Sequence, residues 1–220
     1  MFVHDLAVPV LAAEDHHHLA RVRRVRDGDR LILADGRGAW CTGRMAGEHP
    51  EPDGEVRNVR RPTPAIGVAF ALVKGTKPEL VVQKLTELGV DVIVPFVAER
   101  SVVVWDRHKA EAARVRFDRV AREAAMQSRR AWLPTVEPVT TFDEVAGRKG
   151  VSRADRGGGP ITLARPLVLV GPEGGWSDSE RGRDLPVVAL GDGVLRAETA
   201  AIAAGTLLGA LRWGAVGPMS

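Results

Sequence analysis

Beyond residue 65, apolar runs of strand length alternate with segments of helical period, and this alternation most constrains how the chain can fold. Four apolar runs are predicted as strands: AIGVAFALV, VDVIVPF, PLVLV (166–170) and LPVVAL (185–190). Helices are predicted between and after them, over 77–88, 107–130 and about 197–213. Strands that alternate with helices form parallel sheets covered on both faces. The sequence therefore predicts an α/β domain.

The N-terminal part has a different rhythm. Short apolar runs are separated by the pairs Asp27-Gly28, Asp35-Gly36 and Asp53-Gly54, a pattern typical of a small β-barrel or sandwich. A proline- and charge-rich stretch ends near Pro62–Pro64, which predicts domains at 1–62 and 63–220. Residues 147–160, GRKGVSRADRGGGP, show no strand pattern and are expected to form a loop.

Composition limits the classes of protein to consider. The single cysteine excludes an internal disulfide and any multi-thiolate metal site. No apolar run is long enough for a membrane span, and the first residues lack the basic start of a secretion signal, so a cytoplasmic location is expected. Clusters of arginine are compatible with nucleic acid binding, but solvated faces rich in arginine would give the same composition.

Two glycine-bearing loops follow predicted strands: GPEGG after LVLV, and LGDGVLR after LPVVAL. Ligands of parallel sheets gather at the carboxyl ends of strands, where glycine lets a ligand approach the main chain. Neither loop matches the dinucleotide or P-loop pattern, so each is a tight turn or a different kind of site. Two capping boxes are also predicted, Thr76 with Glu79 and Ser177 with Glu180.

These loops belong to a longer resemblance. GPEGGWSDSE followed by LGDGVLRAETAAIAA resembles the SPOUT-class RNA methyltransferases, and more narrowly the 16S ribosomal RNA uracil-N3 methyltransferases. The segments KGTKPELVVQKLTELGVDVIVPFVAERSVV, AREAAMQSRRAWLP and HHLARVRRVRDGD are similar to further blocks of that family. The match covers nearly the whole chain. It implies a PUA-like β-barrel domain over 1–62 and a SPOUT α/β domain over 63–220, with a parallel sheet and a C-terminal trefoil knot.

The resemblance also implies an activity. Members of the family that it resembles transfer a methyl group from S-adenosylmethionine to N3 of one uridine, of the position 1498 type, in the 16S rRNA of the assembled 30S subunit, and the same activity is expected here. They act as homodimers and need neither a metal nor a membrane. Two alternatives remain: another SPOUT RNA methyltransferase acting on a ribose 2′-hydroxyl, and a non-catalytic RNA-binding factor for ribosome assembly.

Site residues follow by matching the family's motifs. Arg196 and Arg100 are expected to stabilise negative charge that develops on the uracil carbonyls, and Glu198 to act as a base, to orient Arg196 or to hold the knot. The expected cofactor-binding residues lie in the two glycine loops and at the start of the last helix: Val170, Gly171, Glu173, Gly174, Leu190, Gly191, Val194, Leu195 and Thr199.

RNA-binding residues are expected on both predicted domains: Arg21, Arg24, Lys74, Gln127 and Arg130. The triplet His16–His18 is interpreted as a surface or RNA-facing patch, because three successive side chains cannot converge on one metal ion without unusual backbone.

Some positions depart from the family pattern. Arg23 stands where a leucine is expected, and Met126 and Arg129 replace an acidic residue and a glycine. Trp176 takes the place of a phenylalanine and is expected to keep its packing role.

Overall fold

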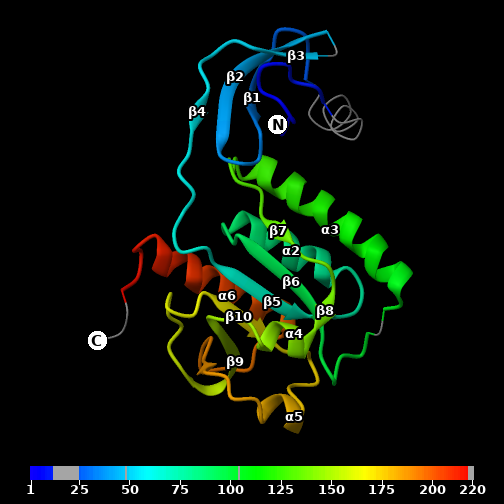
Figure 1. Cartoon of the computed structure of the whole chain (residues 1–220), viewed down its shortest axis with the longest axis vertical. Coiled ribbons are helices and arrows are strands. Elements are labelled where there is room, and N and C mark those ends of the chain that lie inside the picture. Colours follow the sequence, from blue (N-terminus) through cyan, green and yellow to red (C-terminus); the bar gives the residue numbers. More distant parts are fainter. Residues whose placement is uncertain (12–24, 48, 104, 218–220) are drawn as a thin grey trace. The chain divides into compact units, whose positions relative to one another are not determined.

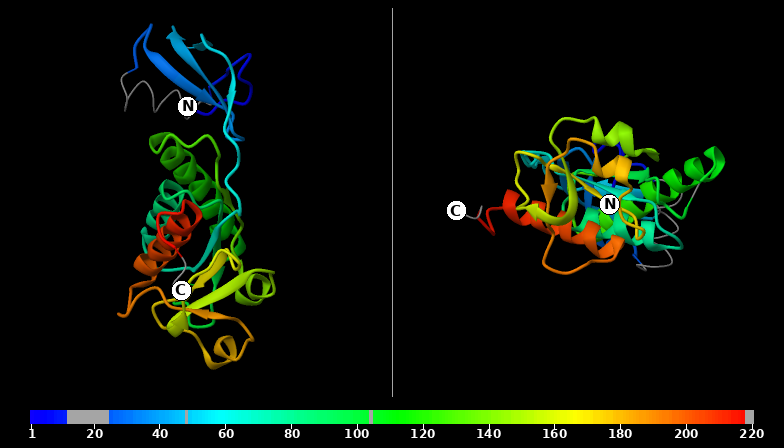
Figure 2. Two further views of the ribbon diagram at one scale, coloured as in Figure 1. Left: turned by 90° about the vertical axis from the view of Figure 1, so that its left-hand side faces the viewer. Right: turned by 90° about the horizontal axis from the view of Figure 1, so that it is seen from below.

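A computed structural model describes residues 1–11, 25–47, 49–103 and 105–217 (Figures 1 and 2). The chain forms two compact units. The N-terminal unit comprises Met1–Arg61 together with Ala125–Leu133, and the C-terminal unit comprises Pro62–Ala124 together with Pro134–Ser220.

The N-terminal unit contains a four-stranded antiparallel sheet. Its strands are β1 (Arg30–Ala34), β2 (Ala39–Ala46), β3 (His49–Pro52) and β4 (Arg57–Asn58), and β2 pairs with each of the other three. The Asp35-Gly36 pair forms the turn between β1 and β2, as predicted, with Gly36 at φ +73°. Residues 125–133 join this unit through backbone bonds, such as the one from the Leu133 N–H to the Gly36 carbonyl at 2.9 Å.

The C-terminal unit is an α/β domain. Its elements are β5 (Gly67–Ala71), α2 (Lys77–Glu87), β6 (Val92–Val97), α3 (Arg107–Gln127), β7 (Thr135–Val136), β8 (Thr140–Thr141), α4 (Phe142–Ala146), β9 (Val151–Gly159), β10 (Leu167–Val170), α5 (Asp178–Arg181), β11 (Val187–Val188) and α6 (Ala197–Arg212). The end of α3, from residue 125, belongs to the N-terminal unit. The strand order is β11-β9-β10-β5-β6-β7, and β8 also pairs with β6. All these pairings are parallel, which confirms the predicted sheet.

Helices cover this sheet on both faces, and the right-hand view of Figure 2 shows α4 and α6 on opposite sides of it. Alternation along β5 explains the two layers. Val68 and Phe70 pack with residues of α2, α3 and α6, whereas Ala69 and Ala71 pack with residues of α4 and with Trp176. Both sets are buried, so the central strand is apolar at every position.

The prediction of a loop over residues 147–160 was wrong, because Val151–Gly159 forms β9 between β10 and β11. Its first residues are buried even though Arg153 is charged, since the guanidinium donates to the carbonyls of Glu180 and Arg181 at 2.7 and 3.0 Å. At Gly158 an added Cβ would lie 2.5 Å from the backbone of Val188. Glycine is therefore needed for close pairing with β11, although it lowers the apparent strand propensity.

The two predicted capping boxes have different outcomes. Ser177 caps α5 with both reciprocal bonds to Glu180, as predicted. Thr76 precedes α2 but its side chain makes no capping bond, so that prediction was wrong. A proline in the first turn, where the missing N–H has no helical partner, begins α2 instead.

The C-terminal end of α6 is anchored in the core. Arg212 pairs with Asp91, and each side chain is only 3% exposed. The guanidinium also donates to the Gly89 carbonyl at 2.7 Å, while the Asp91 carboxylate accepts the Ile66 N–H at 2.9 Å. The last turn of α6 is thus fixed to the segments that lead into β5 and β6. Within the described residues, no helix is both long and apolar enough to cross a membrane.

Candidate functional site

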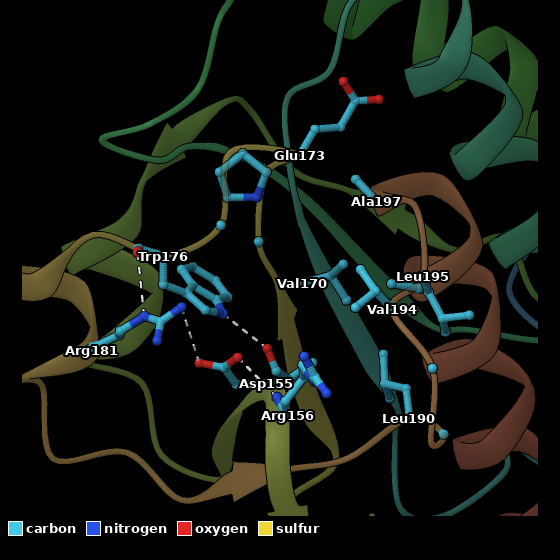
Figure 3. A pocket seen from close by; sticks show the side chains of 17 residues that line it. Asp155, Arg156, Val170, Glu173, Trp176, Arg181, Leu190, Val194, Leu195 and Ala197 are labelled. Carbon is cyan, nitrogen blue, oxygen red and sulfur yellow. Dashed lines mark hydrogen bonds and ion pairs between the residues drawn. The ribbon is translucent and has the colours of Figure 1, made fainter.

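A cavity of about 210 Å³ opens at the carboxyl ends of β10 and β11 (Figure 3). Its wall consists of the end of β10, the two glycine loops, part of β9, Arg181 of α5 and the start of α6. Most of the residues expected to bind a cofactor line it: Val170, Gly171, Glu173, Leu190, Gly191, Val194 and Leu195. Gly174 and Thr199 are not among the lining residues.

One wall of the cavity is apolar. Figure 3 shows Val170, Leu190, Val194 and Leu195 gathered on one side of it. Val194 is 80% exposed and Leu195 is 37% exposed. Apolar side chains this open to water gain free energy when a ligand covers them.

The opposite wall is polar and comes from β9 and α5. Arg181 lies 4.0 Å from Asp155, and the Asp155 carboxylate accepts the N–H of Arg156 at 2.9 Å. These three side chains line the cavity together with Ala154. A ligand held here would therefore meet hydrogen-bonding groups of both charges on one side and hydrocarbon on the other.

The indole of Trp176 packs against Gly171 of the first glycine loop. Its buried indole stacks on Phe96 with ring centroids 6.2 Å apart, and its Nε1–H donates to the Ala154 carbonyl at 2.9 Å. A Cβ added at Gly171 would lie 2.8 Å from the indole. The loop lies this close to the indole only because residue 171 is glycine, so the packing role expected for Trp176 is what the structure has.

The same loop approaches the segment after β6. A Cβ added at Gly174 would lie 3.2 Å from the Arg100 carbonyl, so Arg100 is adjacent to the first glycine loop. Glu99 fixes that segment, since its N–H donates to Glu180 at 2.9 Å. Hydrogen bonds from Ser177 and then Ser179 lower the pKa of the Glu99 carboxyl.

At the start of α2, a charged bridge joins the first glycine loop to the first turn of α6. Lys77 Nζ lies 2.5 Å from Glu173 Oε1 and 3.3 Å from Glu198 Oε1. Its hydrogen bond to Glu173 raises the pKa of Lys77 and lowers the pKa of Glu173. Among the described residues, the second carboxylate oxygen of Glu198 is buried without a hydrogen-bond partner.

The remaining expected residues are distributed over several places. Arg196 is exposed at the N-cap of α6, next to the loop that ends with Leu195. Lys74 is exposed just before α2. Gln127 and Arg130 belong to the N-terminal unit. Arg21, Arg23, Arg24 and His16–His18 lie outside the described residues.

Sequence reasoning missed Lys77 and the wall formed by Asp155 and Arg156. The second omission follows from taking β9 for a loop. Lys77 did leave a signal, because a cation in the first turn of a helix faces the positive end of the helix dipole and is locally unfavourable. No group of three or more potential metal ligands occurs among the residues whose placement is described.

Two family models match the chain, and they divide it in sequence order. One, described as an RNA methyltransferase PUA domain, matches residues 11–51. The other, described as an RNA methyltransferase domain, matches residues 60–209. Together they include most of the N-terminal sheet, without β4, and almost the entire α/β domain.

Relatives of known name match most of the chain, and the chain covers most of their length. The chain is 35% identical to ribosomal RNA small subunit methyltransferase E of Mycobacterium bovis, covering 95% of this chain and 89% of the relative. It is 32% identical to the Bacillus subtilis protein of that name, covering 86% of this chain and 85% of the relative.

Solved structures are similar in fold. A methyltransferase from Legionella pneumophila, in complex with S-adenosylmethionine, has a TM-score of 0.81 and 28% identity and covers 91% of this chain and 90% of its own. Ribosomal RNA small subunit methyltransferase E from Neisseria gonorrhoeae, bound to the same cofactor, has a TM-score of 0.79 with equal identity and coverage. On these matches, the chain belongs to the RNA methyltransferase family, in the group of ribosomal RNA small subunit methyltransferase E proteins.

Proposed function

We propose that this protein is an S-adenosylmethionine-dependent rRNA methyltransferase that modifies N3 of one uridine in the 16S rRNA of the assembled 30S subunit. The observation that supports it most directly is the cavity at the carboxyl ends of β10 and β11, formed by the same two glycine loops that match the family's motifs. The two similar structures that contain S-adenosylmethionine support the choice of cofactor.

The residues around the cavity suit such a cofactor. Val170, Leu190, Val194 and Leu195 offer apolar cover for an adenine ring, and the main chain around Gly171 and Gly191 is open to it. Asp155 and the arginines on the opposite wall offer partners for ribose hydroxyls and for the amino-acid end. When bound, the cofactor supplies an already activated methyl group, so the chain's residues need only position the acceptor and manage its proton.

The acceptor is the harder half of the reaction. A neutral uracil N3 is a poor nucleophile, and its proton must leave as the new bond forms. In this proposal Arg196, exposed at the N-cap of α6, and Arg100, beside Gly174, stabilise the negative charge that develops on the uracil carbonyls. Glu198 is the proposed proton acceptor, and its buried, unpartnered oxygen supports that role among the described residues.

The RNA and a second protomer complete the proposal. Lys74, Gln127 and Arg130, together with Arg21 and Arg24, are proposed to hold phosphates or bases of the rRNA. A homodimer is proposed as the working unit, with a trefoil knot formed by the C-terminal part of the α/β domain. The enzyme would act in the cytoplasm, where ribosomal subunits are assembled.

The test is methyl transfer with a defined acceptor. The protein is incubated with radiolabelled S-adenosylmethionine and 30S subunits that lack the modification, and the labelled nucleotide is mapped by nuclease digestion and mass spectrometry. We expect one methyl group at N3 of one uridine in 16S rRNA. Label on a ribose 2′-hydroxyl would instead identify the other kind of RNA methyltransferase, and cofactor-independent RNA binding without any label would identify an assembly factor.

A further inference from the structure

Lys77 connects three parts of the C-terminal unit that are distant in sequence. It is the first residue of α2, Glu173 lies in the loop after β10, and Glu198 lies in the first turn of α6. One ammonium group therefore contacts a carboxylate of the first glycine loop at 2.5 Å and a carboxylate of α6 at 3.3 Å.

The cost of placing a lysine there indicates that the contact has a purpose beyond folding. A cation in the first turn of α2 opposes the helix dipole. Glu198 is only 13% exposed, and a carboxylate this buried requires a compensating charge. Lys77 provides that charge, while its flexible stem reaches Glu173 on the exposed side, which is 51% open to solvent.

The two carboxylates are attached to the elements that determine the width of the cavity. Glu173 itself lines the cavity, and the first residue of α6, Ala197, which adjoins Glu198, lines it as well. Tying Glu173 to Glu198 therefore fixes the first glycine loop against the start of α6. A loop fixed before the ligand arrives costs less ordering free energy on binding.

We propose that Lys77 is a positioning residue, which holds the loop 171–175 and the start of α6 at the separation that the cofactor needs. The inference depends on the proposed function, since it names S-adenosylmethionine as the ligand whose affinity the bridge controls. Lys77 acts through the two glutamates and need not contact the cofactor or the RNA.

The experiment measures S-adenosylmethionine affinity by calorimetry for the full chain and its variants. Lys77→Met is expected to weaken binding about 10-fold, a typical coupling between a local contact and a ligand site. Lys77→Arg, which keeps the charge and can bridge two carboxylates, is expected to restore affinity to within about 3-fold of the parent.

Lys84→Met is the matched control. Lys84 lies on the same helix, is 39% exposed against 35% for Lys77, and pairs with a glutamate at 2.8 Å, but that partner, Glu87, belongs to α2 itself. Its affinity for S-adenosylmethionine should equal that of the parent. Binding is measured at a temperature at which thermal unfolding shows both lysine variants to be folded, so that reduced affinity does not reflect unfolded protein.

A double-mutant cycle separates the bridge from a general effect. If Lys77 acts through Glu173, Glu173→Gln alone weakens binding and the combination with Lys77→Met is no weaker than the worse single variant, to within about twofold. If the fold-losses in affinity of the two single variants multiply in the double variant, the inference is overturned. It is also overturned if Lys77→Met binds S-adenosylmethionine as tightly as the parent. If the parent chain itself does not bind S-adenosylmethionine, the proposed function fails and this inference fails with it, whereas tight binding by both parent and Lys77→Met refutes the inference alone.

Discussion

Replacing Gly171 by alanine tests the packing on which the first glycine loop depends. The new methyl group would lie 2.8 Å from Cε2 of the Trp176 indole and 3.1 Å from two further ring atoms. The indole cannot move freely, because it is 3% exposed, stacks on Phe96 and donates to the Ala154 carbonyl. Overpacking of this kind costs about 1–3 kcal/mol. For a chain of this length that corresponds to a melting temperature lowered by about 2–12 °C.

Thermal and urea unfolding of Gly171→Ala measure this cost, and Gly193→Ala is the control. Both glycines line the cavity, but an added Cβ at Gly193 meets no atom within 4 Å. The control should therefore unfold within about 0.5 kcal/mol of the parent. Calorimetry with S-adenosylmethionine should show weaker binding by Gly171→Ala, because the loop must move away from the indole.

A second substitution identifies the clash itself. Trp176→Phe removes the fused ring atoms that lie nearest the new methyl group, at the cost of the hydrogen bond to Ala154. In that background, Gly171→Ala should cost less than it does in the parent. Equal stability of Gly171→Ala and the parent would refute the reasoning, and so would a double variant whose loss equals the sum of the two single losses.

Three further outcomes are expected. Arg212→Met should lower the free energy of unfolding by about 3–5 kcal/mol in urea titrations, because it removes the buried guanidinium that pairs with the Asp91 carboxylate, and a loss below about 1 kcal/mol would contradict this. The bridge to Lys77 lowers the pKa of Glu173, so its contribution to stability is complete above the ordinary carboxyl pKa of about 4.3. This contribution is lost as the pH falls through the lowered pKa. Urea titrations from neutral pH to about pH 2.5 should therefore show that stability falls less on the acid side for Lys77→Met than for Lys84→Met. Burial raises the pKa of the Cys41 thiol, so a disulfide thiol reagent at neutral pH should label Cys41 only as fast as the N-terminal unit opens, and rapid labelling of the native protein would show that this core is not closed.

Much of the C-terminal unit is predictable from local pattern, because its central elements are long or uniformly apolar. The apolar run that forms β5 is buried at every position. The sequences of α3 and α6 repeat their apolar residues with the period of an α-helix. The place of the cavity is indicated as well, since ligands of parallel sheets gather at the carboxyl ends of strands, but the loops alone left a tight turn and a ligand site as alternatives.

β9 marks the limit of that approach. Its three final glycines and its charged residues have low strand propensity, and the strand exists because β10 and β11 pair with it on either side. Such pairing is a tertiary property, and Arg153 becomes tolerable in the interior only once the carbonyls at the end of α5 are in place. The missed cavity wall at Asp155 and Arg156 has the same cause. Lys77 shows a different limit, since its partners are brought together only by the folded sheet.

The anchoring of α6 has a consequence for how small molecules enter and leave. Arg212 binds the C-terminal end of α6 to the segments that precede β5 and β6, and the N-terminal end of α6 lines part of the cavity. These contacts of Arg212 oppose a rotation of α6 away from the cavity. Entry and exit of a ligand must therefore depend on the short loop before the helix, where Val194 is exposed. A substitution that makes this loop more rigid should slow ligand exchange more than it changes the equilibrium affinity.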